Sequence, residues 1–270
     1  MLAQAIPAEA PPAEALEGWM ERFHRDGYLL LSGLLAPEDV AAMKEKIDRA
    51  FADEHLTQTD NRYGDFIMCR MFELDPFFQD LLVREPFIGI AEHVLGQDCH
   101  LIAQNCVRNK PGQALDRFHA DESVYFPVSG AMERHDARLR LPVYICTFQM
   151  LLTDVPSDAY GPSQYVAGSH YSGREPNDPY HPSFEGRGPV AVHGKAGDGY
   201  LHNGQCWHRG MPNTSERTRY LFQNSYGRRW IQQRFYPFVN YRLPQRVLDQ
   251  AAGNERMLRV LGKHPKGPYG

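Results

Sequence analysis

Residues 197–223 read GDGYLHNGQCWHRGMPNTSERTRYLFQ, two β-prone runs joined by a segment rich in turn-forming residues. His208 lies at the end of the first run, and Arg219 follows eleven residues later (219 minus 208) at the start of the second. If His208 leaves one strand and the next strand returns antiparallel to it, Arg219 comes back beside His208. The stretch therefore indicates a β-rich fold that places an imidazole and a guanidinium side by side.

The rest of the second half has the same texture. Glycine, proline, asparagine and aspartate clusters separate short β-prone runs, which cover residues 100–108, 142–155, 190–193, 200–207 and 218–226. Helical patterns come first: an apolar face over residues 14–26, a second helix starting at Pro37, and two short pieces over 76–95. Helices followed by many short strands predict helices packed on an all-β core, either a sandwich or a jelly roll.

The composition of the 270 residues bounds the class of protein. Hydrophobic residues make up 42% of the chain, enough for the substantial core of one large domain. A formal net charge of −4 gives no reason to expect nucleic acid or an anionic membrane as partner. No apolar run approaches the roughly 20 residues that span a bilayer. The five scattered cysteines contain no C-x-x-C pair, which favours the reducing cytoplasm over a disulfide framework.

The pattern H-x-D occurs twice, at His24–Asp26 and at His119–Asp121, and about one occurrence is expected by chance. The first pair falls at a predicted helix end, where neighbouring side chains do not share a face. His119 and Asp121 lie in an extended segment, where residues i and i+2 point the same way and can reach one ion. Two histidines and a carboxylate on one face of iron leave three positions open, as non-haem iron(II) oxygenases require. His208 is the candidate for the second histidine.

Four stretches resemble, in the same order, the motifs of the phytanoyl-CoA dioxygenase family of iron(II)- and 2-oxoglutarate-dependent oxygenases. They are FHRDGYLLLSGLLAPEDV (23–40), FHADES (118–123), GPSQYVAGSH (161–170) and GDGYLHNGQCWHRGMPNTSERTR (197–219). Ala167 stands where the family usually has proline, a difference that affects a turn and no ligand. The resemblance implies a mainly β fold with flanking helices, whose core is a double-stranded β-helix (a cupin-like jelly roll).

The resemblance also implies roles for individual residues. His119, Asp121 and His208 would bind iron(II), and Arg219 would bind the distal carboxylate of the co-substrate 2-oxoglutarate. With O2, such an enzyme oxidises a small organic metabolite, by hydroxylation, desaturation or ring closure, and converts 2-oxoglutarate to succinate and CO2. Related halogenases carry a small residue at the position of Asp121, so a carboxylate there disfavours chlorination.

Weaker candidates surround these residues. Gln149 and Lys110 are candidates for binding 2-oxoglutarate, although a buried glutamine serving the backbone and a solvated loop lysine explain them equally well. Arg117, Tyr125 and Phe126 flank the metal motif and are candidates for the substrate wall. Four further residues are set aside: His202 as the less favoured ligand, His170 as structural, Trp207 as core and Cys206 as an unsupported nucleophile.

Two other functions compete with the oxygenase. A zinc or manganese isomerase or hydrolase on the same scaffold would need the triad but not Arg219. A non-catalytic binding jelly roll usually has an incomplete triad, whereas every ligand position is filled here. For the chain as a whole we expect a mobile tail over residues 1–14 and a single domain over 15–270. That domain would have a helical part to about residue 98, a jelly-roll core over 99–228 and a closing segment over 229–270, with a helix over 244–261.

Overall fold

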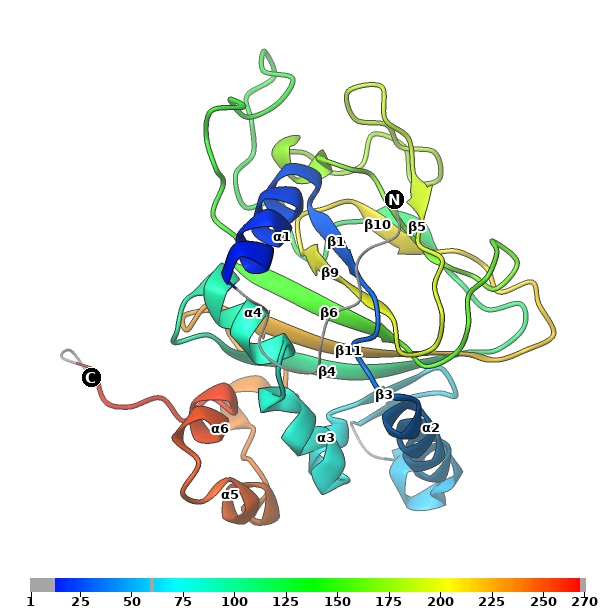
Figure 1. The fold of residues 1–270 in the computed structure, drawn as a ribbon, viewed down its shortest axis with the longest axis vertical. Coiled ribbons are helices and arrows are strands. Elements are labelled where there is room, and N and C mark those ends of the chain that lie inside the picture. The colour runs from blue at the N-terminus through cyan, green and yellow to red at the C-terminus, as the bar shows by residue number, and fades with distance from the viewer. Residues whose placement is uncertain (1–12, 59–60, 268–270) are drawn as a thin grey trace.

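The computed structural model describes residues 13–58 and 61–267, which form two antiparallel β-sheets and a layer of helices (Figure 1). From edge to edge the larger sheet contains β1 (Tyr28–Leu31), β9 (Gly199–Asn203), β6 (Ile145–Leu151), β11 (Arg219–Gly227), β4 (His100–Asn109), β3 (Ile67–Cys69) and β2 (Arg62–Tyr63). The smaller sheet contains β5 (Leu115–His119), β10 (His208–Gly210), β7 (Ser163–Tyr165) and β8 (Val190–Ala191). Each of the five predicted β-prone runs therefore overlaps a strand.

Strand β6 shows why both faces of the larger sheet are covered. All seven of its residues are buried, and in a strand successive side chains point to opposite faces. Phe148 packs edge-on against Phe87 in the core beneath the helices, whereas Leu151 belongs to the core between the two sheets. The odd-numbered side chains of β6 therefore face the smaller sheet, where the candidate site lies.

The helices lie along the outer side of the larger sheet and at its ends (Figure 1). The α-helices are α1 (Ala13–Asp26), α2 (Pro37–Ala52), α3 (Pro76–Asp80), α4 (Phe87–Leu95), α5 (Gln245–Ala251) and α6 (Glu255–Val260). The 3₁₀ turns are η1 (Glu54–Gln58), η2 (Met71–Glu73), η3 (Leu81–Val83), η4 (Ser169–Tyr171) and η5 (Phe238–Asn240). Helix α2 starts with Pro37, as predicted, because proline has no backbone N–H to leave unpaired at that position. No helix in the described part of the chain is long and apolar enough to cross a bilayer.

The structure differs from the sequence analysis in two helical regions. The single helix predicted over 244–261 is two helices, because Gly253 adopts a left-handed φ of 78° and Asn254 caps the start of α6 by accepting from Met257 N. Helix α1 begins at Ala13, so it includes the last two residues of the tail predicted over 1–14. The rest of that predicted tail, residues 1–12, lies outside the described residues.

The stretch 197–223 does not fold as one antiparallel return. β9 ends at Asn203, and Cys206 N then donates to Asn203 O over 2.9 Å in a turn before β10 begins at His208. β10 pairs with β5 and β7, whereas β11 pairs with β4 and β6 in the other sheet. Arg219 approaches the smaller sheet because the two sheets pack face to face, and not because β11 pairs with β10.

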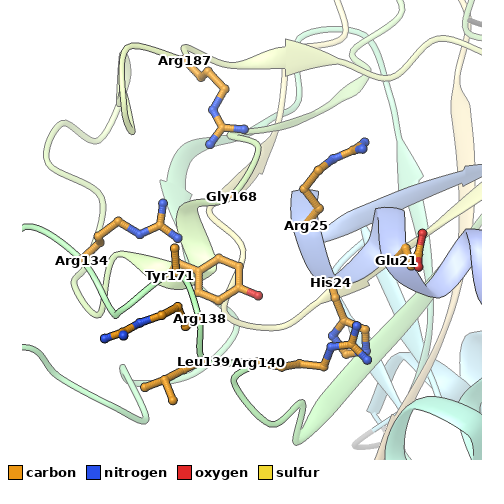
Figure 2. A pocket seen from close by; sticks show the side chains of 11 residues that line it. Glu21, His24, Arg25, Arg134, Arg138, Leu139, Arg140, Gly168, Tyr171 and Arg187 are labelled. Carbon is orange, nitrogen blue, oxygen red and sulfur yellow. The ribbon is translucent and has the colours of Figure 1, made fainter.

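A pocket of about 470 Å³ opens between the end of α1, the loop around residues 134–140 and η4 (Figure 2). Five arginines line it: Arg25, Arg134, Arg138, Arg140 and Arg187. Four of these arginines form ion pairs with carboxylates. Arg25 pairs with Asp26, Arg138 pairs with Asp136, and both Arg134 and Arg187 pair with Glu185. Arg140 has no ion-pair partner among the described residues. The carboxylates thus neutralise most of this pocket.

Candidate active site

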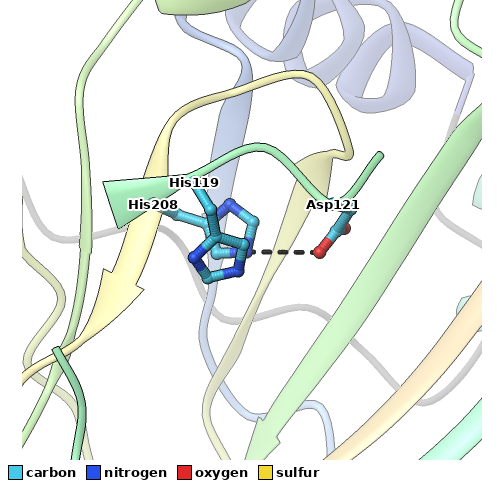
Figure 3. Close-up of side chains that lie close together, drawn as sticks. All are labelled: His119, Asp121 and His208. Atoms are coloured by element: carbon cyan, nitrogen blue, oxygen red, sulfur yellow. Dashed lines mark ion pairs between the residues drawn. The ribbon is translucent and has the colours of Figure 1, made fainter. Parts of the chain in front are cut away.

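Three potential metal ligands meet at one end of the smaller sheet (Figure 3). His119 is the last residue of β5, and His208, the first residue of β10, lies opposite it in the antiparallel register. Asp121 follows His119 by two residues, and its backbone N donates to Gly204 O over 2.8 Å. One ligand atom from each side chain lies within 4.8 Å of the other two. The fold therefore brings together the three residues that the sequence singled out.

Hydrogen bonds fix which nitrogen of each imidazole is free. His119 Nδ1 lies 3.0 Å from Arg117 O, and His208 Nδ1 lies 2.9 Å from Cys206 O. Because a carbonyl oxygen only accepts, both Nδ1 atoms carry a proton, and in each neutral imidazole Nε2 is then the nitrogen with the lone pair. His208 Nε2 lies 3.4 Å from Asp121 Oδ1, so the candidate ligand nitrogen and the candidate ligand oxygen face each other. Metal-binding histidines use this arrangement, in which the second nitrogen is held by an outer partner.

The electrostatics of the triad suit a cation. Burial raises the pKa of Asp121, but His208 and the hydrogen bonds from His202 and His208 outweigh burial and hold that pKa well below its usual range. Burial, together with the neighbouring His208, lowers the pKa of His119. Asp121 is thus an anion and His119 is neutral at physiological pH. Burial lowers the pKa of His208, but the Asp121 carboxylate outweighs burial and raises that pKa, so a metal would take the place of a proton on His208 Nε2.

Arg219 is a buried cation with an unused donor. It is the first residue of β11, it is 5% exposed, and its guanidinium donates to Gly161 O. Its Nε has no hydrogen-bond partner among the described residues. A Cβ placed on Gly210 would lie 3.9 Å from one guanidinium nitrogen, so Arg219 reaches the strand that carries His208. Gly210 is two residues, or about 7 Å, along β10 from His208. This environment fits a carboxylate, which would satisfy the free donor and the charge together.

The two weaker co-substrate candidates lie in different environments. Gln149 faces the space between the sheets, but its Oε1 accepts from Tyr200 Oη over 3.1 Å and its Nε2 lies 3.3 Å from Tyr165 Oη. Lys110 is partly exposed and forms a 3.0 Å ion pair with Asp65. Protein groups therefore occupy the polar atoms of both side chains.

Two aromatic residues that the sequence does not single out, Tyr144 and Trp230, pack beside Tyr125 and Phe126, the candidates for the substrate wall. Tyr125 and Phe126 line a narrow cavity next to Ala120, and Arg117 is exposed on β5. The ring of Tyr144 lies 5.2 Å from that of Tyr125 and 5.6 Å from that of Phe126, and Trp230 packs edge-on against Tyr144 at 4.7 Å. No sequence spacing links Tyr144 and Trp230 to the metal motif, because only the tertiary fold brings them together.

A model of the phytanoyl-CoA dioxygenase (PhyH) family matches residues 23–221. Among curated proteins, the ectoine dioxygenase of Nocardia farcinica is 29% identical over 125 residues, which are 40% of this chain and 41% of the relative. The ectoine dioxygenase of Bordetella parapertussis is 27% identical over 192 residues, which are 67% of this chain and 59% of the relative. The matches therefore span less than two thirds of the length of either relative.

Two kinds of solved structure share the fold. The epimerase SnoN, crystallised with Fe3+, alpha ketoglutarate and nogalamycin RO, has a TM-score of 0.63 at 21% identity, over 83% of this chain and 88% of its own. HygX from Streptomyces hygroscopicus, with nickel and 2-oxoglutarate bound, has a TM-score of 0.62 at 19% identity, over 83% of this chain and 89% of its own. HygX has also been crystallised with hygromycin B. These likenesses and the two facing sheets confirm the predicted jelly-roll fold.

Proposed function

The chain belongs to the phytanoyl-CoA dioxygenase family, and we propose that it is an iron(II)- and 2-oxoglutarate-dependent oxygenase that oxidises a small organic molecule. The observation that carries the proposal is the convergence of His119, Asp121 and His208, with both imidazole Nδ1 atoms held by carbonyl groups, both Nε2 atoms turned toward the triad and the carboxylate ionised. Two histidines and one carboxylate with further positions open are the ligand set of non-haem iron(II) oxygenases. The iron and nickel centres of the structural neighbours support the same assignment.

His119 and His208 would bind the metal through Nε2, and Asp121 through its carboxylate. Iron(II) bound there would let O2, the oxidant, oxidise the substrate and 2-oxoglutarate together, with 2-oxoglutarate becoming succinate and CO2. The protein holds the ligands in place through the carbonyl groups of Arg117 and Cys206 and through the backbone contact of Asp121 with Gly204.

Arg219 would bind the distal carboxylate of 2-oxoglutarate. A planar guanidinium offers two parallel N–H groups to a carboxylate, and a buried site strengthens that pairing. The free Nε of Arg219 and the side-chain-free Gly210 beside it support this role. Gln149 and Lys110 are not part of the proposal, because protein groups occupy their polar atoms.

The substrate would lie against Tyr125 and Phe126, with Arg117 at the rim of the site. These rings would offer apolar surface to the substrate and help to exclude water from the metal face. A small organic molecule with both apolar and polar surface suits such a wall, and the small-molecule ligands of the neighbouring structures support the same class.

The experiment is anaerobic reconstitution with iron(II) and 2-oxoglutarate, followed by admission of O2 with a panel of small organic metabolites. We expect O2-dependent succinate formation that at least one metabolite accelerates and that His119→Ala abolishes. His193→Ala is the matched control, because His193 also contacts a carboxylate, Asp158 at 2.8 Å, on the surface. Turnover of a substrate without succinate would instead indicate a metal-dependent isomerase or hydrolase and contradict the proposal.

A further inference from the structure

Asp121 has a second histidine partner that is not part of the triad. His202, on β9 of the larger sheet, is 1% exposed, and its Nε2 lies 3.1 Å from Asp121 Oδ2. The other carboxylate oxygen, Oδ1, faces His208 at 3.4 Å. Because the ionised carboxylate has no proton to give, His202 Nε2 must be the donor. The two oxygens of Asp121 thus have different partners: Oδ2 accepts from His202, and Oδ1 faces His208 in the triad.

The tautomer of His202 depends on Tyr165. A neutral imidazole that donates through Nε2 must accept through Nδ1. Tyr165 Oη, at 3.1 Å, is the nearer donor to that atom, and Gln149 Nε2 lies 3.4 Å from it. Tyr165 is fully buried on β7, opposite His208 in the strand register, and its ring stacks on the His208 ring with centroids 5.6 Å apart. With the proton on Nδ1 instead, the Nε2 lone pair would face the anionic carboxylate. The Tyr165 hydroxyl therefore favours the tautomer that can hold Asp121.

Further hydrogen bonds lead from Tyr165 to Ser163, and each donor in this chain points toward His202. Gln149 Nε2 donates to Tyr165 Oη over 3.3 Å, Tyr200 Oη donates to Gln149 Oε1 over 3.1 Å, and Ser163 Oγ lies 2.5 Å from Tyr200 Oη. Each group in this sequence can donate one proton forward and accept one from behind. The chain crosses between the two sheets, and all of its members are buried, so bulk water does not compete for these bonds.

The far end of the chain lies near the proposed co-substrate site. Burial raises the pKa of Tyr200, and the nearby Arg219 guanidinium opposes that rise. In the pairing of β7 with β10, Ser163 lies opposite Gly210. Gly210 has no side chain and leaves space beside Arg219. The hydrogen-bonded chain from Ser163 to His202 thus leads from the neighbourhood of Arg219 to Asp121.

We propose that His202 is a positioning residue that orients Asp121 so that Oδ1 faces the metal, and that Tyr165 acts through His202 by fixing its tautomer. This inference rests on the proposed function, because it takes the triad as the metal site. It assigns a role to His202 that is distinct from ligation, and it also accounts for the buried amide of Gln149.

The test is the affinity of the metal-free protein for Ni(II), measured by calorimetry, which needs no turnover. Loss of an outer partner of a metal ligand typically weakens binding about 10–100-fold, and we expect that range for His202→Phe. His202→Gln keeps an N–H donor near the position of Nε2 and should restore most of the affinity. Tyr165→Phe keeps the ring and removes only the hydroxyl, so it should weaken binding less than His202→Phe does. The double variant should bind no more weakly than His202→Phe, because Tyr165 acts through His202.

Two matched controls remove similar groups elsewhere. His100→Phe removes a buried imidazole that contacts Ile231 O at 2.8 Å, and Tyr226→Phe removes a buried hydroxyl that donates to Leu82 O over 2.9 Å. Both should keep the wild-type Ni(II) affinity even where they lower stability.

Three outcomes would overturn the inference. The first is a wild-type Ni(II) affinity in His202→Phe, and the second is an equal loss of Ni(II) affinity in His202→Gln and His202→Phe. The third is additive losses of Ni(II) affinity from Tyr165→Phe and His202→Phe. If His202→Phe does not fold, unchanged affinity in Tyr165→Phe overturns it equally. Two other results would contradict the proposed function itself: no Ni(II) binding by the wild-type protein, or Ni(II) binding that survives His119→Ala. Failure of the proposed function can therefore be told apart from failure of this inference.

Discussion

His208 lies directly opposite His119 in the antiparallel register of β10 and β5, with ring centroids 4.4 Å apart. The two residues are 89 positions apart in the sequence (208 minus 119), yet one pair of strand neighbours sets their separation. A slip of one residue would turn one imidazole to the other face of the sheet. The register of two short strands therefore determines whether the triad can form, and Asp121 needs only the two-residue step from His119.

Arg219 should control the affinity for 2-oxoglutarate and not that for the metal. Truncating one partner of a buried charge pair costs about 2–5 kcal/mol, which corresponds to a loss of roughly 30-fold or more. We expect that loss for Arg219→Gln and a smaller one for Arg219→Lys, which keeps the charge but not the planar fork. Equilibrium binding of 2-oxoglutarate to the Ni(II)-loaded protein measures both. Arg217→Lys is the control, because the Arg217 guanidinium stacks on Tyr160 near the surface. Unchanged affinity in Arg219→Gln would show that the co-substrate binds elsewhere.

Cys206 should be chemically inert in the folded protein, although it is two residues from His208. Burial raises the pKa of its thiol to about 12, and the side chain is fully buried. A thiol needs its thiolate form to react. We expect Cys206→Ala to keep succinate formation near the wild-type rate, and a thiol reagent to label Cys206 rapidly only after denaturation. Stoichiometric labelling of Cys206 in the native protein, with loss of activity, would contradict this.

Gly27 should tolerate no side chain, because two constraints coincide there. Its φ of 83° is left-handed, and a Cβ would lie 2.5 Å from His170 Nδ1 and 2.9 Å from Cys206 Sγ. Gly33 has a similar φ of 66° but nothing within 4 Å of an added Cβ. Gly33→Ala should therefore cost only the backbone strain of about 1–2 kcal/mol. Gly27→Ala should cost a further ~1–3 kcal/mol for overpacking. Urea unfolding gives both values, and equal costs would contradict the crowding at Gly27.

The sequence predicted the parts of the site that depend on short spacings. His119 and Asp121 lie two residues apart in extended chain, and the glycine that ends α1 is visible as Gly27 within the motif FHRDGY. The buried stripe of α2 and the strand β6 also follow from local apolar patterns. Each of these features is fixed by interactions within one element, so the sequence carries it directly.

Features that depend on pairing between elements could not be predicted. β10 is only three residues long, too short for a periodic pattern, and it belongs to a different sheet from β9 and β11 on either side of it. The contact between His202 and Asp121 joins β9 of the larger sheet to the loop that follows β5 of the smaller sheet. Gln149 is a candidate from the sequence, but its partners Tyr165 and Tyr200 come from two further strands.

The central claim is that His119, Asp121 and His208 hold one iron(II) to which 2-oxoglutarate adds. Equilibrium dialysis against iron(II) without oxygen, followed by elemental analysis, tests it most directly. We predict one iron per chain in the wild type and in His193→Ala, and none in His119→Ala, Asp121→Ala or His208→Ala. Added 2-oxoglutarate should tighten iron binding in the wild type and much less in Arg219→Gln. Retention of one iron per chain by any of the three triad variants, or no iron in the wild type, would contradict the account.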